Sequence, residues 1–213
     1  PLVIPPSRLK AIRRDFYREL AGLAAQRNEP PDQSRRRDAL QQLVGVRDLP
    51  PAQEPVVSIS LARASDLKIL KSPGIQDASL PLLPGALQRL DNAGRSFARE
   101  TERIVWELPL AIFDDQWPAY QAEVDALIER GFERFRLQNL GQFELFAKHA
   151  PSGLETGYRL FTLNSQAALV WQSLGAVAAT LYVEDDKPNF ADLLARDLDL
   201  KLQVIAYANL PMM

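Results

Sequence analysis

Polar side chains with catalytic or binding chemistry lie at the carboxyl ends of several predicted strands or just after them. A carboxylate shielded from water serves as a general acid or base, while amides, hydroxyls and phenols orient a polar ligand. In a fold of parallel strands the carboxyl ends meet at one edge, where such groups converge. The candidates are Glu107, Asn139, Asn164, Ser165, Glu184, Tyr207 and Asn209.

Each candidate also has a structural interpretation. Asn139, Asn164 and Ser165 each stand just before a predicted helix, where a side-chain oxygen satisfies free backbone N–H groups. Glu107 interrupts an apolar strand, so either Arg103 or Arg136 pairs with it or it serves a site. The run 184–186 (Glu-Asp-Asp) is either a ligand cluster for a hard cation or a solvated acidic turn.

Strand and helix patterns alternate along the chain from residue 56 onward. The predicted strands cover 56–61, 79–83, 103–109, 135–137, 158–163, 178–183 and 202–208. The predicted helices cover 85–92, 118–130, 142–148, 166–174 and 190–197, the last with Asn189 as its cap. This alternation predicts parallel strands joined by right-handed crossovers, in an α/β fold that is a partial or complete TIM-type (β/α) barrel. An open doubly wound sheet is the alternative.

A different pattern opens the chain. Leu9, Ile12, Phe16, Leu20 and Leu23 recur three or four residues apart, which predicts an amphipathic helix capped by Ser7 and ending near Asn28. Prolines and an arginine run follow, which is typical of a linker. We therefore predict residues 1–55 as a helix with a Pro/Arg-rich linker and 56–213 as the barrel portion.

Composition restricts the chemistry. The chain has no cysteine and one histidine, His149, so its own residues supply neither a disulfide nor a thiolate or multi-histidine metal site. His149 lies at the end of a predicted helix, a position that suits its charge. Residues 1–50 hold ten Lys and Arg against six Asp and Glu, and the remainder holds fifteen against twenty-one. No apolar run is long enough to cross a bilayer, so we expect a cytoplasmic protein with no membrane partner.

Three segments carry a family resemblance. Residues 132–145 (FERFRLQNLGQFEL), 158–175 and 207–213 resemble conserved segments of the collagenase-like peptidase family U32. The opening residues 5–14 resemble the stretch that follows an accessory domain in longer members. The sequence departs from the family at Phe161, at Tyr182-Val183 and at Ala208-Asn209.

The resemblance implies a TIM-type barrel followed, in family members, by cysteines that hold an iron-sulfur cluster. Several bacterial relatives act in hydroxylation of RNA bases or of ubiquinone precursors, and proteolysis is the older assignment. From this resemblance we expect the full-length parent to be an iron-sulfur-dependent hydroxylase of RNA bases rather than a protease. Because this chain has no cysteine, it holds no such cluster itself, and the cluster is implied for a full-length parent. We expect an excised fragment or a degenerate member that is inactive alone, whose partners are RNA or peptide and the rest of its parent.

On this interpretation Glu184 and Tyr207 are the predicted catalytic residues, and Asn139, Asn164, Ser165, Glu107 and Asn209 bind substrate. The first alternative is a non-catalytic module that binds RNA or peptide. The second is a hydrolase in which Glu184 and Glu107 act with a metal-bound water.

Overall fold

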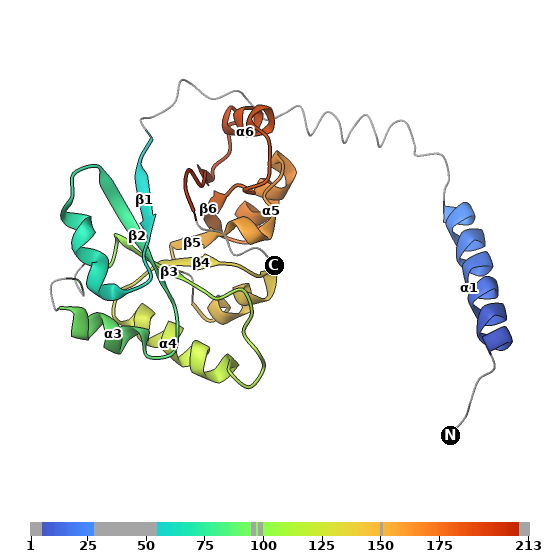
Figure 1. Cartoon of the computed structure of the whole chain (residues 1–213), viewed down its shortest axis with the longest axis horizontal. Coiled ribbons are helices and arrows are strands. Elements are labelled where there is room, and N and C mark those ends of the chain that lie inside the picture. The colour runs from blue at the N-terminus through green and yellow to red at the C-terminus, as the bar shows by residue number, and fades with distance from the viewer. Residues whose placement is uncertain (1–5, 28–54, 95–96, 98–99, 150, 209–213) are drawn as a thin grey trace. The chain divides into compact units, whose positions relative to one another are not determined.

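The structure is a computed structural model that describes residues 6–27, 55–94, 97, 100–149 and 151–208. The chain divides into two compact units, Pro1–Val46 and Arg47–Met213. The described part of the first unit is one helix, α1 (Pro6–Arg27), and the second unit is an α/β fold (Figure 1). The predicted linker lies almost wholly outside the described residues.

Helix α1 confirms the helix predicted from the apolar spacing, with one correction. The predicted cap, Ser7, lies inside the helix, which starts at Pro6. Ile12, Phe16, Leu20 and Leu23 all remain about half exposed, so the apolar side of this helix is uncovered in the described part of the chain.

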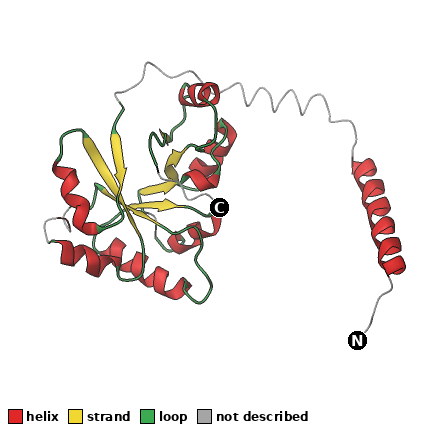
Figure 2. Cartoon of the chain, in the orientation of Figure 1, coloured by secondary structure: helices red, strands yellow, loops and turns green. Residues whose placement is uncertain are grey.

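The second unit contains one seven-stranded sheet in which every described pairing is parallel. The strands are β1 (Val57–Ser60), β2 (Ile75–Pro81), β3 (Ile104–Glu107), β4 (Arg134–Leu137), β5 (Gly153–Thr156), β6 (Ala176–Thr180) and β7 (Lys201–Gln203). They lie side by side in chain order and curl into a half-barrel, a partial TIM-type barrel (Figure 2). The predicted fold class is confirmed. The doubly wound alternative is wrong, because it requires the strand order to reverse at a switch point and here it never does.

Helical segments connect successive strands and cover the outer face of the sheet. They are η1 (Ala64–Lys71), α3 (Ala86–Ala93), α4 (Trp117–Glu129), η3 (Leu140–Phe146), η4 (Tyr158–Leu160), α5 (Ser165–Ser173) and α6 (Lys187–Leu194). Three of them, the η segments, are 3₁₀ helices, which are narrower than α-helices. None of the described helices has both the length and the apolar character that a membrane crossing requires.

Alternation along the strands decides which residues form the core. In β4, Phe135 and Leu137 face the helices and join Val124 and Leu127 of α4 in the main apolar cluster, so the intervening Arg134 and Arg136 face the other way. A smaller cluster around Ala168, Ala176, Ala179 and Leu200 fixes α5 against β6. The helices thus pack on one side of the sheet, and the inner side of the curl is left for other residues.

Several predicted boundaries are wrong. The strand expected at 158–163 is instead the short helix η4 followed by an isolated bridge from Thr162 to Leu181, and the actual strand β5 precedes it. The second and last strands start earlier than predicted, as β2 and β7 show, and η1 was not predicted. Helix α6 begins at Lys187 and is capped by Asp186, whose Oδ1 accepts a hydrogen bond from the Asn189 N–H, so Asn189 is not the cap.

Candidate functional site

The inner face of the half-barrel is lined by a polar network. Its members come from six strands: Asp77 and Ser79 (β2), Glu107 (β3), Arg134 and Arg136 (β4), Glu155 (β5), Thr180 (β6) and Gln203 (β7), with Gln138 directly after β4. We call this set the inner-face network. Branched apolar layers fill the interior of an ordinary TIM barrel, whereas the described inner face of this half-barrel is polar.

Glu155 is the centre of the network. Its Oε1 accepts hydrogen bonds from Nη2 and Nε of Arg134 at 2.5 and 3.2 Å, and its Oε2 accepts from Nη2 and Nε of Arg136 at 2.8 and 3.2 Å. Gln203 Nε2 donates to the same Oε2 at 3.2 Å. Glu155 is 1% exposed, and these five bonds replace the water that a buried carboxylate loses.

Asp77 completes the charge balance around Arg134. Its Oδ2 accepts a hydrogen bond from Arg134 Nη1 at 2.8 Å. Burial by itself would lower the pKa of the Arg134 guanidinium, but the negative charges of Glu155 and Asp77 outweigh this and raise it. Arg134 is therefore held as a cation between two carboxylates and is committed to the structure of the sheet.

Glu107 differs from the other two carboxylates because it remains partly open to solvent. It lies at the carboxyl end of β3 with 29% of its side chain exposed. Gln138 Nε2 donates to its Oε1 at 2.7 Å, Ser79 Oγ donates to its Oε2 at 3.3 Å, and Arg136 Nη1 lies 3.8 Å from Oε2. Of the two partners considered from sequence, Arg136 is confirmed, whereas Arg103 binds Glu100 and the carbonyls of Leu70, Ile75 and Gln76.

The position of Gln138 depends on a glycine in the neighbouring strand connection. A Cβ added to Gly157 would lie 2.5 Å from Gln138 Cδ, so only glycine leaves room for this amide. Gln142 fixes the same turn, because its Oε1 accepts from the Gln138 N–H at 2.8 Å and its Nε2 donates to the Pro109 carbonyl at 2.6 Å. Gln138 Oε1 is buried and has no partner in the described part of the chain. The backbone bond to Gln142 and the space left by Gly157 therefore hold the Gln138 side chain so that its Nε2 donates to Glu107.

Two of the predicted asparagines, Asn139 and Asn164, act as helix caps. Asn139 Oδ1 accepts from the Gly141 N–H at 2.8 Å at the start of η3, and Asn164 Oδ1 accepts from the Ala167 N–H at 2.9 Å at the start of α5. Ser165 is the first residue of α5 and not its cap. Asn164 and Ser165 line a small hollow of about 70 Å³ together with Asn189, Asp192 and Arg196 of the α6 region. Their substrate-binding roles stay predictions.

The two predicted catalytic residues lie in exposed loops. Tyr182 Oη donates to Glu184 Oε2 at 3.1 Å, and this hydrogen bond raises the pKa of Tyr182. Tyr207 is 95% exposed beyond β7, and Asn209 lies outside the described residues. Glu107 ends β3 and Glu184 follows β6 at the same edge of the sheet, yet no ion pair or hydrogen bond within the described residues joins their groups.

The acidic run 184–186 is accounted for by local bonds. Asp186 caps α6, and Asp185 accepts from its neighbour's N–H and from Asn189 Nδ2. In the part of the chain that the structure describes, no group of three or more His, Cys, Asp and Glu side chains is arranged to hold a metal ion.

Sequence reasoning missed Asp77, Arg134 and Glu155, which carry most of the network. The signal was present in β4, where Arg134 and Arg136 alternate with Phe135 and Leu137. An alternating strand has one polar face, and in a parallel sheet a polar face needs partners on the adjacent strands. Those partners could be identified only from the register between β4 and β5, which pairs Arg136 with Glu155.

The fold has a solved counterpart. The structure is similar to that of the U32 peptidase Mk0906, with a TM-score of 0.51 and 9% sequence identity over 73% of this chain and 70% of that chain. At this identity the likeness concerns the fold alone. No protein-family model matches the sequence, and no curated protein matches it.

Proposed function

We propose that the chain is the barrel portion of a U32-like protein, and that the carboxyl edge of its sheet binds peptide through Glu107. The observation that carries the proposal is the geometry of Glu107: a partly exposed carboxylate, fixed by Gln138 and Ser79, at the edge where parallel barrels bind ligands. The fold likeness to a U32 peptidase supports the choice of a peptide ligand.

Charge favours peptide over RNA. The guanidiniums of Arg134 and Arg136 are engaged by Glu155 and Asp77, whereas Glu107 keeps an open side. Residues 51–213 hold fifteen Lys and Arg against twenty-one Asp and Glu, which repels a phosphate backbone. Backbone amides and amino groups of a peptide are donors, and donors match a carboxylate acceptor.

Gelatin provides the test, because it offers unfolded peptide. Wild type, Glu107→Gln and the control Glu129→Gln, an exposed carboxylate on α4, are compared for gelatin binding by surface plasmon resonance. Glu107→Gln removes the charge at nearly constant shape, so we expect at least about tenfold weaker binding, in line with loss of a charge-assisted hydrogen bond. We expect Glu129→Gln to bind as wild type does.

Three other results would overturn the proposal. Equal binding by wild type and Glu107→Gln would show that Glu107 is not the binding group. Salt-sensitive binding of single-stranded RNA, with no binding of gelatin, would favour the RNA-binding module instead. Cleavage of gelatin that is lost in Glu184→Gln or Tyr207→Phe would establish the hydrolase in place of a binding module.

The hydroxylation of RNA bases implied by the family is a proposal about a longer parent protein. None of the 213 residues is a cysteine, so an iron-sulfur cluster does not fit the residues present and its thiolates would have to come from outside this sequence. A parent chain purified without oxygen that shows no iron and no visible absorbance would contradict this proposal without affecting peptide binding by Glu107.

A further inference from the structure

Exposed apolar side chains follow three neighbouring strands at the carboxyl edge of the sheet, the edge at which Glu107 lies. They belong to the segments that begin after β3, β4 and β5, and each is between 41% and 67% exposed. Two of these segments are joined, because Gln142 Nε2 donates to the Pro109 carbonyl and Asn139 Nδ2 donates to the Leu110 carbonyl. We call the exposed apolar residues the edge surface: Leu110, Phe113, Leu140, Phe161 and Leu163.

Phe161 is held in its exposed position by its backbone and by a neighbouring ring. Its φ is 53°, in the left-handed region that bulky residues rarely adopt. Its ring centroid lies 4.9 Å from that of Tyr182 after β6. Strained residues of this kind concentrate at binding and catalytic sites. The strain at Phe161 therefore supports a binding role for the edge surface.

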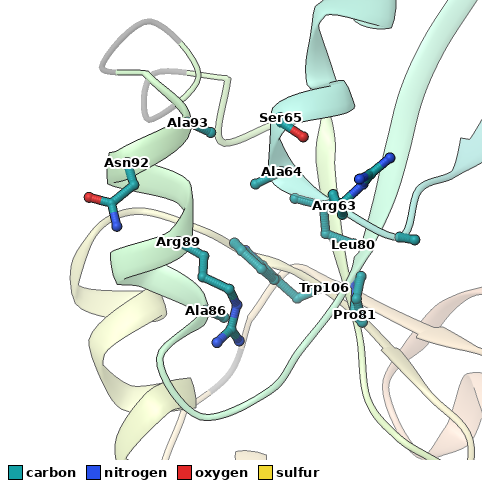
Figure 3. A pocket seen from close by; sticks show the side chains of 11 residues that line it. Arg63, Ala64, Ser65, Leu80, Pro81, Ala86, Arg89, Asn92, Ala93 and Trp106 are labelled. Atoms are coloured by element: carbon teal, nitrogen blue, oxygen red, sulfur yellow. The ribbon is translucent and has the colours of Figure 1, made fainter.

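The segments around the edge surface are negatively charged. On the β1 and β2 side of the sheet the charge is positive, because Arg63 and Arg89 line a cavity of about 330 Å³ between η1 and α3 (Figure 3). Negative charge disfavours nucleic acid, anionic lipid and a second copy of the same surface, and it attracts a cationic partner. The segments that connect β3 to α4, β4 to η3, β5 to α5 and β6 to α6 contain one cation, Arg159, and five carboxylates: Asp114, Asp115, Glu184, Asp185 and Asp186.

The inner-face network has one more negative charge than positive, and the excess lies at Glu107. Glu107 is 29% exposed, and its nearest guanidinium contact is 3.8 Å long, whereas the other two carboxylates are buried and bonded directly to arginine. A carboxylate has about four lone-pair sites, and within the described residues only Gln138 and Ser79 donate to Glu107. A ligand cation would balance this charge. The ionised groups of the network are Asp77, Glu107 and Glu155 against Arg134 and Arg136.

We propose that the edge surface binds peptides in which a lysine or arginine is flanked by apolar residues. The cationic group pairs with Glu107, and the apolar neighbours pack against Leu110, Leu140 and Phe161. The charge-assisted hydrogen bond selects the cation, and burial of apolar area adds affinity. This inference rests on the proposed peptide binding at Glu107 and states which peptides are bound.

Three acetylated and amidated pentapeptides separate charge from apolar contact: GLKFG, GLEFG with the charge reversed, and GGKGG without apolar side chains. Binding is followed in ¹H–¹⁵N spectra of the whole chain. The Gln138 side-chain amide reports on Glu107, and the backbone amides of Leu110 and Leu140 report on the edge surface. We expect GLKFG to bind at least about tenfold more tightly than either of the other peptides. The comparison uses one unchanged protein, so it does not depend on the folding of a variant.

Variants assign the two contributions to residues. We expect Glu107→Gln to reduce the ratio of affinities for GLKFG and GLEFG at least about threefold. Phe113→Ser and Leu140→Ser should each weaken binding of GLKFG about threefold and leave the affinity for GGKGG unchanged. Val170→Ser changes a similarly exposed apolar residue on α5 and is the matched control, which we expect to bind as wild type does.

The outcomes distinguish this inference from the function on which it rests. Equal affinity for GLKFG and GLEFG, with gelatin binding still weakened in Glu107→Gln, would overturn the inference and leave peptide binding at Glu107 standing. Unchanged gelatin binding in Glu107→Gln would overturn both. Equal affinity for GLKFG and GGKGG would overturn the role of the edge surface. A dimer in sedimentation equilibrium that Phe113→Ser converts into a monomer would assign the edge surface to a second copy of the chain instead.

Discussion

Glu155 shows how one buried side chain joins three strands directly and a fourth through its partner Arg134. It lies in β5 and binds both arginines of β4 and Gln203 of β7, while Arg134 also reaches Asp77 of β2. A buried carboxylate between two guanidiniums gains little over an apolar core of the same volume, but removal of one partner leaves the others uncompensated. Substitution of one member of the network should therefore lower the free energy of unfolding by more than the whole network contributes to it.

The first prediction concerns this residue. We expect Glu155→Gln to lower the free energy of unfolding by about 3 kcal/mol, because Arg134 and Arg136 lose their shared counter-charge. Urea unfolding with a linear extrapolation provides the measurement. Glu144→Gln, an exposed change on η3, is the control and should stay within about 0.5 kcal/mol of wild type. Equal losses in the two variants would contradict the central role of Glu155.

The second prediction concerns Asp125 and pH. His149, predicted only to suit a helix end, instead places its Nε2 2.8 Å from Asp125 Oδ1, which also accepts from Gln121 Nε2 at 2.8 Å. Burial alone would raise the pKa of Asp125, but the hydrogen bonds from Gln121 and His149 and the charges of His149 and Lys148 lower it below the ordinary value of 3.8. The carboxylate therefore stabilises the fold above pH 3.8, and this contribution is lost as pH falls through the lowered pKa.

We accordingly expect Asp125→Asn to be less stable than wild type at pH 6 and to lose less stability between pH 4 and pH 2. Urea unfolding at several pH values measures both effects. The control Asp115→Asn, which changes an exposed carboxylate, should give a curve parallel to wild type. A wild-type slope in Asp125→Asn would show that its bonds do not contribute to acid unfolding.

At the scale of elements, the polar inner face explains why β5 was predicted in the wrong place. The strand Gly-Leu-Glu-Thr has one large apolar residue, Leu154, because Glu155 faces the network and Gly153 leaves space for Arg134. The segment 158–163 has the aromatic and β-branched residues that strands favour, yet Phe161 adopts a φ of 53° that ends η4. The pattern of apolar residues predicts a strand only where that strand packs an apolar face against the core. Strand β5 directs Glu155 into the polar inner face, so its apolar pattern is weak.

Elements that pack an apolar face between the sheet and its helices were predicted well, because their apolar residues recur with a clear period. The strand at β3, the helix at α4 and the caps of η3 and α5 follow from local patterns of apolar and capping residues. The register that joins Glu155 to its arginines spans 19 to 21 residues of sequence and has no local signal. The pairing of Glu155 with Arg134 and Arg136 was therefore visible only in the folded structure.

The third prediction tests the close approach of two strand connections. In Gly157→Ala the new Cβ collides with the Gln138 amide, which is buried and held by Glu107. We expect a loss of about 1 to 3 kcal/mol in the free energy of unfolding. In a Gln138→Ala background the same substitution should cost much less, because the colliding amide is gone. Equal costs in both backgrounds would place the effect of Gly157 elsewhere.

At the scale of the whole sheet, the strand order leaves β1 and β7 with one described neighbour each. The central strands β3 and β4 are paired on both sides and carry the largest buried side chains, Trp106 and Phe135. Local opening requires least free energy where pairing and burial are least.

The fourth prediction is a gradient of hydrogen exchange across the sheet. We expect amides of β3 and β4 to exchange at least roughly tenfold more slowly than those of β1 and β7. Exchange followed by NMR or mass spectrometry measures this directly. Uniform protection from β1 to β7 would mean that an additional element covers the two outer strands.

The order of the strands also bears on how the chain acquires its fold during synthesis. Each strand pairs with the one made just before it, so the ribosome can deliver the sheet strand by strand onto an existing edge. The inner-face network forms later: Asp77 has no arginine partner until Arg134 is made 57 residues further on, and Arg136 is joined by Gln203 only 67 residues later. The nascent barrel thus assembles its backbone early and completes its interior charges last.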